Sequence, residues 1–153
     1  MGFVFRLERV LAVRRLQEEV AQQFLSRARE TLRGERARLE AVEEDLRRAV
    51  SDVDALKRTD ELDAEALRLH SRYAGLQRCR VSRAREAVEG ASRAVEDASR
   101  AVLDAHRARQ ALEKLRERDE AAWRAAVSRR EACRIDAVAA ARHRGRREED
   151  RGH

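Results

Sequence analysis

The chain has 153 residues, of which 42% are charged and 3% aromatic, and it contains six glycines and no proline. This composition excludes a thick globular interior, because a compact core normally uses more aromatic and β-branched side chains. The 35 basic and 29 acidic residues leave a net charge of +6, and such interspersed charges are typical of solvated helix faces. We therefore expect an all-α coiled coil that buries only a narrow apolar seam.

The N-terminal segment carries two of the five aromatic residues, Phe3 and Phe5. Charged residues such as Arg6 and Glu8 interrupt every apolar run near the start, so we expect neither a signal peptide nor a membrane span. This favours a cytoplasmic protein. We expect a first helix over about residues 4–57, with Phe3 and Phe5 closing the open end of a hairpin beside residues 111–118.

The first helix should pair through a heptad seam. Apolar residues recur at steps of three and four, interrupted only by Glu35: Leu25, Ala28, Leu32, Leu39, Val42, Leu46, Ala49, Val53 and Leu56. Outside this seam the helix is also apolar, at Val10, Val13, Leu16, Val20 and Phe24. One partner helix cannot cover all of that width.

The pattern lapses at KRTDELD, residues 57–63, where Thr59 or Asp60 can cap a new helix. We place a turn at about 58–61 and a second helix at about 62–143. The hairpin then forms one domain over residues 1–143. Residues 144–153 are expected to form a disordered charged tail.

The second helix has its own seam: Val81, Ala84, Val88, Ala91, Val95, Ala98, Val102 and Ala105. In an antiparallel pair, the numbers of facing residues have a nearly constant sum. The sum is 118–120 if Ala49 faces Leu69, Leu46 faces Tyr73, Val42 faces Leu76 and Leu25 faces Val95, with one register slip near Gly75. This constancy favours an antiparallel hairpin over a parallel self-dimer.

Beyond about residue 118 the second helix has no partner from the first, so its last 25 residues should overhang by about 37 Å. This overhang carries Trp123, Val127, Ile135 and Val138 roughly along one side. It also holds an arginine-rich stretch, with eight arginines and two acidic residues between Arg124 and Arg147. Such a stripe favours a protein partner. Fraying, pairing with a second copy and nucleic-acid binding are the alternatives.

No pattern in the sequence indicates catalysis. There is no glycine-rich phosphate loop and no zinc motif, and the four histidines (70, 106, 143 and 153) are too far apart on a helix to share a metal. Cys79 and Cys133 are too far apart on one helix to form a disulfide, so we expect free thiols. We therefore expect a protein that is not an enzyme and that needs no cofactor or metal.

Four stretches together resemble the flagellar export protein FliJ family. They are Phe-x-Phe-x-Leu-x-x-Val-Leu-x-Val-Arg at residues 3–14, Tyr-x-x-Leu at Tyr73 and Leu76, LEKLRER at 112–118 and IDAVAAAR at 135–142. Their order and spacing cover nearly the full chain. Ala137 departs from the family pattern, which commonly has an acid there.

The resemblance implies an antiparallel two-helix coiled coil similar to the central stalk of rotary ATPases. It implies a non-catalytic component of the flagellar type III protein export apparatus, cytoplasmic and peripheral to the inner face of the cell membrane at the flagellar base. Such a stalk binds the hexameric export ATPase, promotes its assembly and activity, and links it to the export gate and export chaperones. The alternatives are the equivalent stalk of a virulence-type secretion system and a self-associating coiled-coil scaffold.

On this hypothesis, the ATPase-binding end comprises residues 3–24 and 108–142, and the gate contact lies on exposed faces around residues 42–80. The candidate gate or chaperone contacts are Tyr73 and Leu76. The candidate ATPase-binding residues are Phe3, Phe5, Leu7, Val10, Val13, Trp123, Val127, Ile135 and Val138. Neither nucleic acid nor insertion into the membrane is expected.

Overall fold

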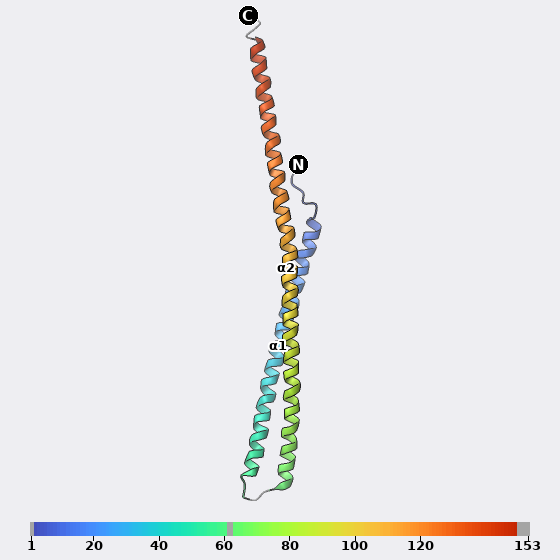
Figure 1. The fold of residues 1–153 in the computed structure, drawn as a ribbon, viewed down its shortest axis with the longest axis vertical. Helices are drawn as coiled ribbons and strands as arrows, with labels where there is room; N and C mark the ends of the chain where they lie inside the picture. Colours follow the sequence, from blue (N-terminus) through green and yellow to red (C-terminus); the bar gives the residue numbers. More distant parts are fainter. Residues whose placement is uncertain (1, 61–62, 150–153) are drawn as a thin grey trace. The chain divides into compact units, whose positions relative to one another are not determined.

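In the computed structural model the chain forms two long α-helices that pack antiparallel as a hairpin (Figure 1). Helix α1 spans Glu8–Lys57 and helix α2 spans Ala64–Glu149. The structure describes residues 2–60 and 63–149, with side chains described as far as residue 142. Within these ranges there is no separate third helix, because the C-terminal stretch continues α2. The predicted all-α, two-helix coiled coil is confirmed.

The hairpin divides into two compact units, and each unit takes residues from both helices. Unit 1 consists of Met1–Arg15 and Arg107–His153, and unit 2 consists of Leu16–His106. Unit 2 contains the turn and most of the seam between the helices. Unit 1 contains the N-terminal segment and the C-terminal part of α2.

The apolar seam of unit 2 agrees with most of the predicted heptad positions. Every predicted position of α1 from Leu25 to Leu56, including Glu35, is buried or half-buried. The predicted positions of α2 from Val81 to Ala105 are likewise buried or half-buried, and Val81 is only 5% exposed. Regular steps of three and four therefore identified the paired faces correctly over most of this unit.

The prediction is wrong for the part of α2 nearest the turn. Tyr73 and Leu76, which were expected to face α1, are 48% and 59% exposed. The seam instead uses four residues that continue the spacing of Val81 without any slip near Gly75: Leu67, His70, Ala74 and Gln77. The sequence pattern misled because two of these four side chains are polar, while the exposed ones are strongly apolar.

The pairing register also differs from the expected one. Glu43 and Arg85 form an ion pair of 2.8 Å between the helices, and their numbers add to 128. The Oε1 atom of Glu18 and the Nδ1 atom of His106 lie 2.9 Å apart, and the numbers of these residues add to 124. Both values exceed the expected 118–120. The expected register placed Leu76 and Tyr73 in the seam. It is wrong because both side chains point to solvent.

The turn is closed by hydrogen bonds of Thr59 and Asp63. The Thr59 hydroxyl donates to the Ala55 carbonyl at 3.2 Å at the end of α1. The Asp63 carboxylate accepts from the backbone N–H groups of Glu65 at 2.9 Å and Ala66 at 3.1 Å. Asp63 is therefore the N-cap of α2, since it satisfies N–H groups that the first helical turn leaves unpaired. The expectation that Thr59 or Asp60 caps this helix is wrong.

The helix boundaries near the termini also differ from the expected ones. Helix α1 begins at Glu8 and not at about residue 4, because residues 2–5 are not helical and residues 6 and 7 form a turn in which the Glu8 N–H donates to the Phe5 carbonyl at 3.2 Å. Helix α2 begins at Ala64 and continues to Glu149. The backbone is thus helical over 144–149, where a disordered tail was expected. Residues 150–153 of that tail lie outside the described residues.

Candidate partner-binding surfaces

The N-terminal segment of unit 1 is held against α2 by aromatic residues. The rings of Phe3 and Trp123 lie 6.1 Å apart between centroids, inclined at 50°, which is a favourable tilted arrangement. Phe5 is 6% exposed and Leu11, on the first turns of α1, is fully buried. We call Phe3, Phe5, Leu11 and Trp123 the aromatic clasp. It explains why aromatic side chains stand at the very start of the chain.

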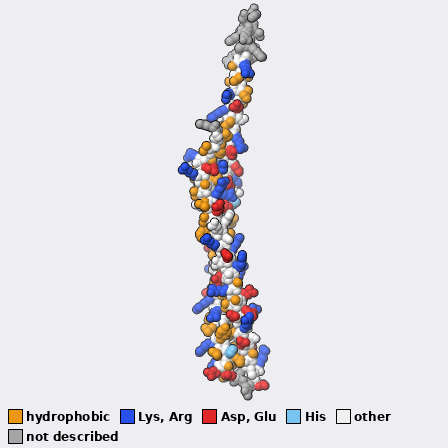
Figure 2. All heavy atoms as spheres, turned by 180° about the vertical axis from the view of Figure 1, so that it is seen from behind, with side chains coloured by type: hydrophobic (Ala, Val, Ile, Leu, Met, Phe, Trp, Pro, Cys, Tyr) orange, Lys and Arg blue, Asp and Glu red, His pale blue; other side chains and the backbone are white. Residues whose placement is uncertain are grey.

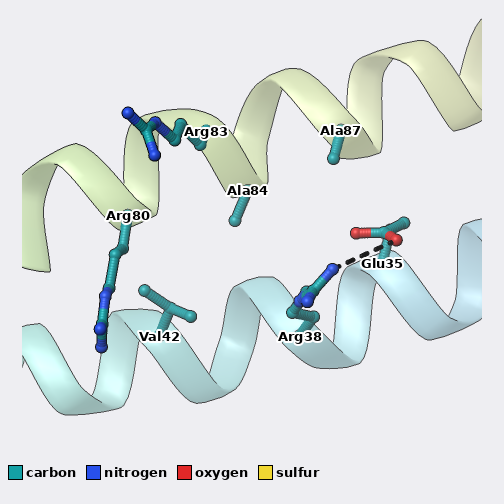
Figure 3. Close-up of a pocket in the computed structure, with 7 residues that line it drawn as sticks. All are labelled: Glu35, Arg38, Val42, Arg80, Arg83, Ala84 and Ala87. Carbon is teal, nitrogen blue, oxygen red and sulfur yellow. Dashed lines mark ion pairs between the residues drawn. The ribbon is translucent and has the colours of Figure 1, made fainter.

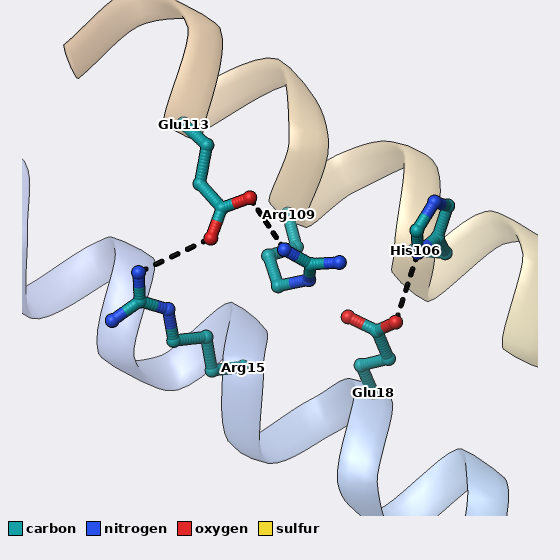
Figure 4. A network of polar contacts seen from close by, with 5 residues as sticks. All are labelled: Arg15, Glu18, His106, Arg109 and Glu113. Atoms are coloured by element: carbon teal, nitrogen blue, oxygen red, sulfur yellow. Dashed lines mark hydrogen bonds and ion pairs between the residues drawn. The ribbon is translucent and has the colours of Figure 1, made fainter. Parts of the chain in front are cut away.

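Charged side chains add a second tie within unit 1. Glu113 of α2 accepts hydrogen bonds from Arg109, one turn earlier, and from Arg15 of α1 at 3.1 Å (Figure 4). These two guanidinium groups, Arg109 more than Arg15, lower the pKa of the Glu113 carboxyl. Glu8 and Arg116 form a further pair at 3.6 Å. These ion pairs therefore help to hold the start of α1 on α2.

From Trp123 of the clasp onward, α2 carries an exposed apolar stripe. Trp123, Val127, Ile135 and Val138 are 37%, 42%, 62% and 48% exposed, and we call them the C-terminal stripe. The separation of 11 residues places Val127 and Val138 within about 20° of each other around the helix axis. Hydrophobic side chains are visible on the surface of this part of the helix in Figure 2.

Arginines surround the C-terminal stripe. Between residues 124 and 142 there are five arginines but only two acidic residues, Glu131 and Asp136. Arg124 pairs with Glu120 of the preceding turn at 2.6 Å. All described side chains from 127 to 142 are exposed. This segment therefore presents both apolar contact area and excess positive charge.

The structure separates the nine predicted ATPase-binding residues into two groups. Six are exposed: Val10, Val13, Trp123, Val127, Ile135 and Val138. Phe5 is buried, and Phe3 and Leu7 are half-buried. Phe5 belongs to the packing of unit 1 and offers almost no surface to a partner. The candidate contact surface of unit 1 is therefore smaller than the predicted set.

Unit 2 has its own exposed apolar patch near the turn, which we call the turn-side patch. It consists of Leu69, Tyr73 and Leu76, and Leu69 is 67% exposed. Their spacing of four and three residues places them along one side of α2. Leu69 was expected to face Ala49 in the seam, so its exposure was not predicted. The apolar spacing that it shares with Tyr73 and Leu76 was the available signal, and Figure 2 shows hydrophobic side chains at this end of unit 2.

A shallow groove of about 370 Å³ lies between the helices of unit 2 (Figure 3). Its lining includes three arginines, Arg38, Arg80 and Arg83, together with the small side chain of Ala84. Glu35 also lines it and pairs with Arg38 at 3.8 Å. Among the described residues, the Oε2 atom of Glu35 has no hydrogen-bond partner. The groove is open, and its lining carries three arginines and one carboxylate.

Unit 2 exposes further large apolar residues outside the turn-side patch. They are Leu16, Val20 and Phe24 of α1, as the width of the apolar face predicted, and Leu103 of α2.

The thiols of Cys79 and Cys133 are free and exposed. Over residues 2–60 and 63–149, no group of three potential metal ligands comes together. In the same part of the chain, neither helix has an apolar stretch suited to crossing a bilayer.

Comparison with known proteins identifies the family but gives no individual relative. Neither the curated proteins nor the solved structures contain a significant match to this chain. A family model described as "Flagellar FliJ protein" matches residues 3–148. The match includes all of α1, all but the last residue of α2, the aromatic clasp and the C-terminal stripe. Members of this family are non-catalytic components of the flagellar export apparatus. Because the match covers nearly the whole chain, the chain belongs to the FliJ family.

Proposed function

We propose that this protein binds the hexameric flagellar export ATPase as a stalk, and promotes assembly and activity of the hexamer. The observation that carries the proposal is the C-terminal stripe of unit 1, which is apolar, exposed and followed along α2 by arginines. On this proposal the stripe enters the ATPase ring, and the exposed Val10 and Val13 add contacts from α1. The protein works at the cytoplasmic side of the flagellar base, peripheral to the inner face of the membrane.

The physical argument rests on how helices recognise proteins. A helix that presents apolar residues about one turn apart fits a hydrophobic groove, which covers them and gains the free energy of their burial. The surrounding arginines favour a groove with an acidic rim, because complementary charges speed encounter and fix orientation. The aromatic clasp supports this role indirectly, since it fixes the first turns of α1 beside the base of the stripe.

We further propose that unit 2 contacts the export gate or export chaperones through Tyr73 and Leu76. Both side chains are exposed on α2, and Leu69 extends the same patch. Substitution of Tyr73 and Leu76 by alanine should weaken binding to the purified cytoplasmic domain of the gate and leave ATPase binding unchanged. Unaltered gate and chaperone binding in this variant would refute the assignment.

The ATPase proposal is tested with two variants that add the same charge to opposite faces of α2. The test variant is Val127→Asp with Val138→Asp, on the stripe. The matched control is Ala125→Asp with Ala132→Asp, whose side chains are also exposed but point to the other side of the helix. Trp123 stays unchanged in both variants, because its ring also packs on Phe3.

The readouts are affinity for the purified cognate ATPase and its ATP turnover when it is titrated with the protein. The stripe variant should lose at least about 30-fold in affinity, the equivalent of about 2 kcal/mol, because two central apolar contacts become unpaired charges. It should also fail to stimulate turnover, while the control behaves as the unaltered protein. Equal binding by both variants, with helix content preserved by circular dichroism, would overturn the proposal.

A further inference from the structure

A buried glutamine interrupts the seam of unit 2 close to the turn. Gln77 of α2 is 1% exposed, yet among the described residues neither its Nε2 nor its Oε1 atom has a hydrogen-bond partner. The neighbouring seam residues, Ala74 and Val81, are 3% and 5% exposed and have no polar side-chain atoms. A buried amide without partners loses its hydrogen bonds to water and gains none in return. Separation of the helices at this point would restore them.

The seam between Gln77 and the turn is also thin. On α2 it contains a single large aliphatic residue, Leu67, beside His70 and Ala74. Three large apolar residues of the same stretch, those of the turn-side patch, point to solvent and do not strengthen the seam. Local stability depends on buried apolar contacts, so this part of the hairpin resists opening less than the Val/Ala seam of residues 81–105.

The same region also differs from the rest of unit 2 in its polar contacts between the helices. Among the described residues from 44 to 80, no ion pair or hydrogen bond joins α1 to α2 outside the turn. The ion pair between the helices that lies next to this region, on the side away from the turn, joins Glu43 and Arg85 at 2.8 Å. This pair marks the boundary between a tied and an untied part of unit 2.

We propose that the turn-side part of unit 2, residues 46–60 of α1 with 63–77 of α2, opens as a local unit while the rest of unit 2 stays paired, and that the unpartnered amide of Gln77 sets the ease of this opening. The opening is a conformational device built into the hairpin. It exposes the inner faces of both helices near the turn, beside the turn-side patch, without unfolding the remaining seam.

The test is amide hydrogen exchange on the full chain, with substitutions that change the polarity of residue 77 and little else. In Gln77→Met a side chain of similar length and shape loses the amide, so exchange of the turn-side amides should slow by about tenfold. Exchange within residues 25–43 and 81–98 should not change. Gln23→Met is the matched control, because Gln23 is exposed on α1, and it should leave exchange unaltered throughout.

A second variant drives the equilibrium in the opposite direction. Gln77→Glu places a carboxylate in the same position, so turn-side amides should exchange faster than in the unaltered protein at neutral pH. This difference between the two proteins, measured at the same pH, should shrink on acidification, when the carboxylate is protonated. The proposal would be overturned if turn-side exchange is the same in Gln77→Met as in the unaltered protein. It would also be overturned if Gln77→Met or Gln77→Glu changes exchange equally over the whole of unit 2, because the opening would then not be local.

Discussion

Two stretches of α2 carry aliphatic residues at similar helical spacing, but only one of them is covered. In unit 2, Val81 is 5% exposed and Ala91 9%, because a segment of α1 packs against them. In unit 1, Ile135 and Val138 are 62% and 48% exposed. Local sequence is apolar in both stretches, so the difference comes from the presence or absence of a partner helix. On the proposed function, another protein covers this exposed apolar stripe.

The largest difference between the two stretches is expected when the same charge is placed in each of them. Val81→Asp should lower the free energy of unfolding by about 3 kcal/mol, because a carboxylate would replace a buried aliphatic group in the seam. Val127→Asp should change it by about 0.5 kcal/mol or less, because residue 127 is already solvated. Thermal unfolding followed by circular dichroism measures both.

The expected difference between these two variants distinguishes a stalk from a self-associating scaffold. If a second copy covered the stripe, Val127→Asp would destabilise the protein nearly as much as Val81→Asp, and the loss would increase with protein concentration. Light scattering on the unaltered protein should then show a dimer. A large, concentration-dependent effect of Val127→Asp would therefore contradict the interpretation of the stripe as a free contact surface.

The aromatic clasp allows an intermediate effect to be measured within unit 1. Phe5→Ala removes a large buried ring and should destabilise the start of α1 locally by about 2–3 kcal/mol. Amides of the first turns of α1 should exchange faster, and the emission of Trp123, the single tryptophan, should shift toward that of a solvated indole. Phe3→Ala should shift the emission with a smaller effect on exchange, since Phe3 is only half-buried. Unchanged exchange in Phe5→Ala would show that the clasp does not hold the helix start.

The covered faces of the hairpin could be predicted from sequence wherever the seam is made of aliphatic residues. The α1 seam from Leu25 to Leu56 needed only the regular recurrence of Leu, Ala and Val. Prediction failed where Gln77 and His70 occupy seam positions beside the more apolar Leu76 and Leu69. Periodicity offers two apolar faces there, and only the packing register along the whole hairpin decides which of them is buried.

The candidate contact surface was predicted in part for the same reason. Exposure of Val10, Val13 and the C-terminal stripe followed from helix width and from the missing partner helix. The packing of Phe5 was also expected, since Phe3 and Phe5 were predicted to close the open end of the hairpin. The ring contact of Phe3 with Trp123 was not predicted, because residues 2–5 are not helical and helical periodicity does not apply to them. The N-cap was missed although Asp63 directly precedes a strong helix-forming run. Thr59 and Asp60 also belong to the residue types that favour N-caps, and only the path of the chain through the turn decides which residue caps the helix.

The smallest expected effect concerns the ion pairs that hold α1 on α2 in unit 1. Because Arg109 and Arg15 lower the pKa of Glu113 in the folded protein, the unfolded state binds a proton more readily than the folded state. The stabilisation is therefore fully present above the ordinary carboxyl pKa of 4.5 and is lost as the pH falls through the lowered value. Glu113→Gln should slightly lower the melting temperature at neutral pH, and this difference should vanish in acid. Its side chain is 28% exposed, so added salt should weaken the effect by screening. The exposed Glu117 provides the control, and Glu117→Gln should leave the melting temperature at neutral pH unchanged. If the deficit of Glu113→Gln persisted unchanged at pH values well below 4.5, the contribution of Glu113 would come from packing and not from its charge.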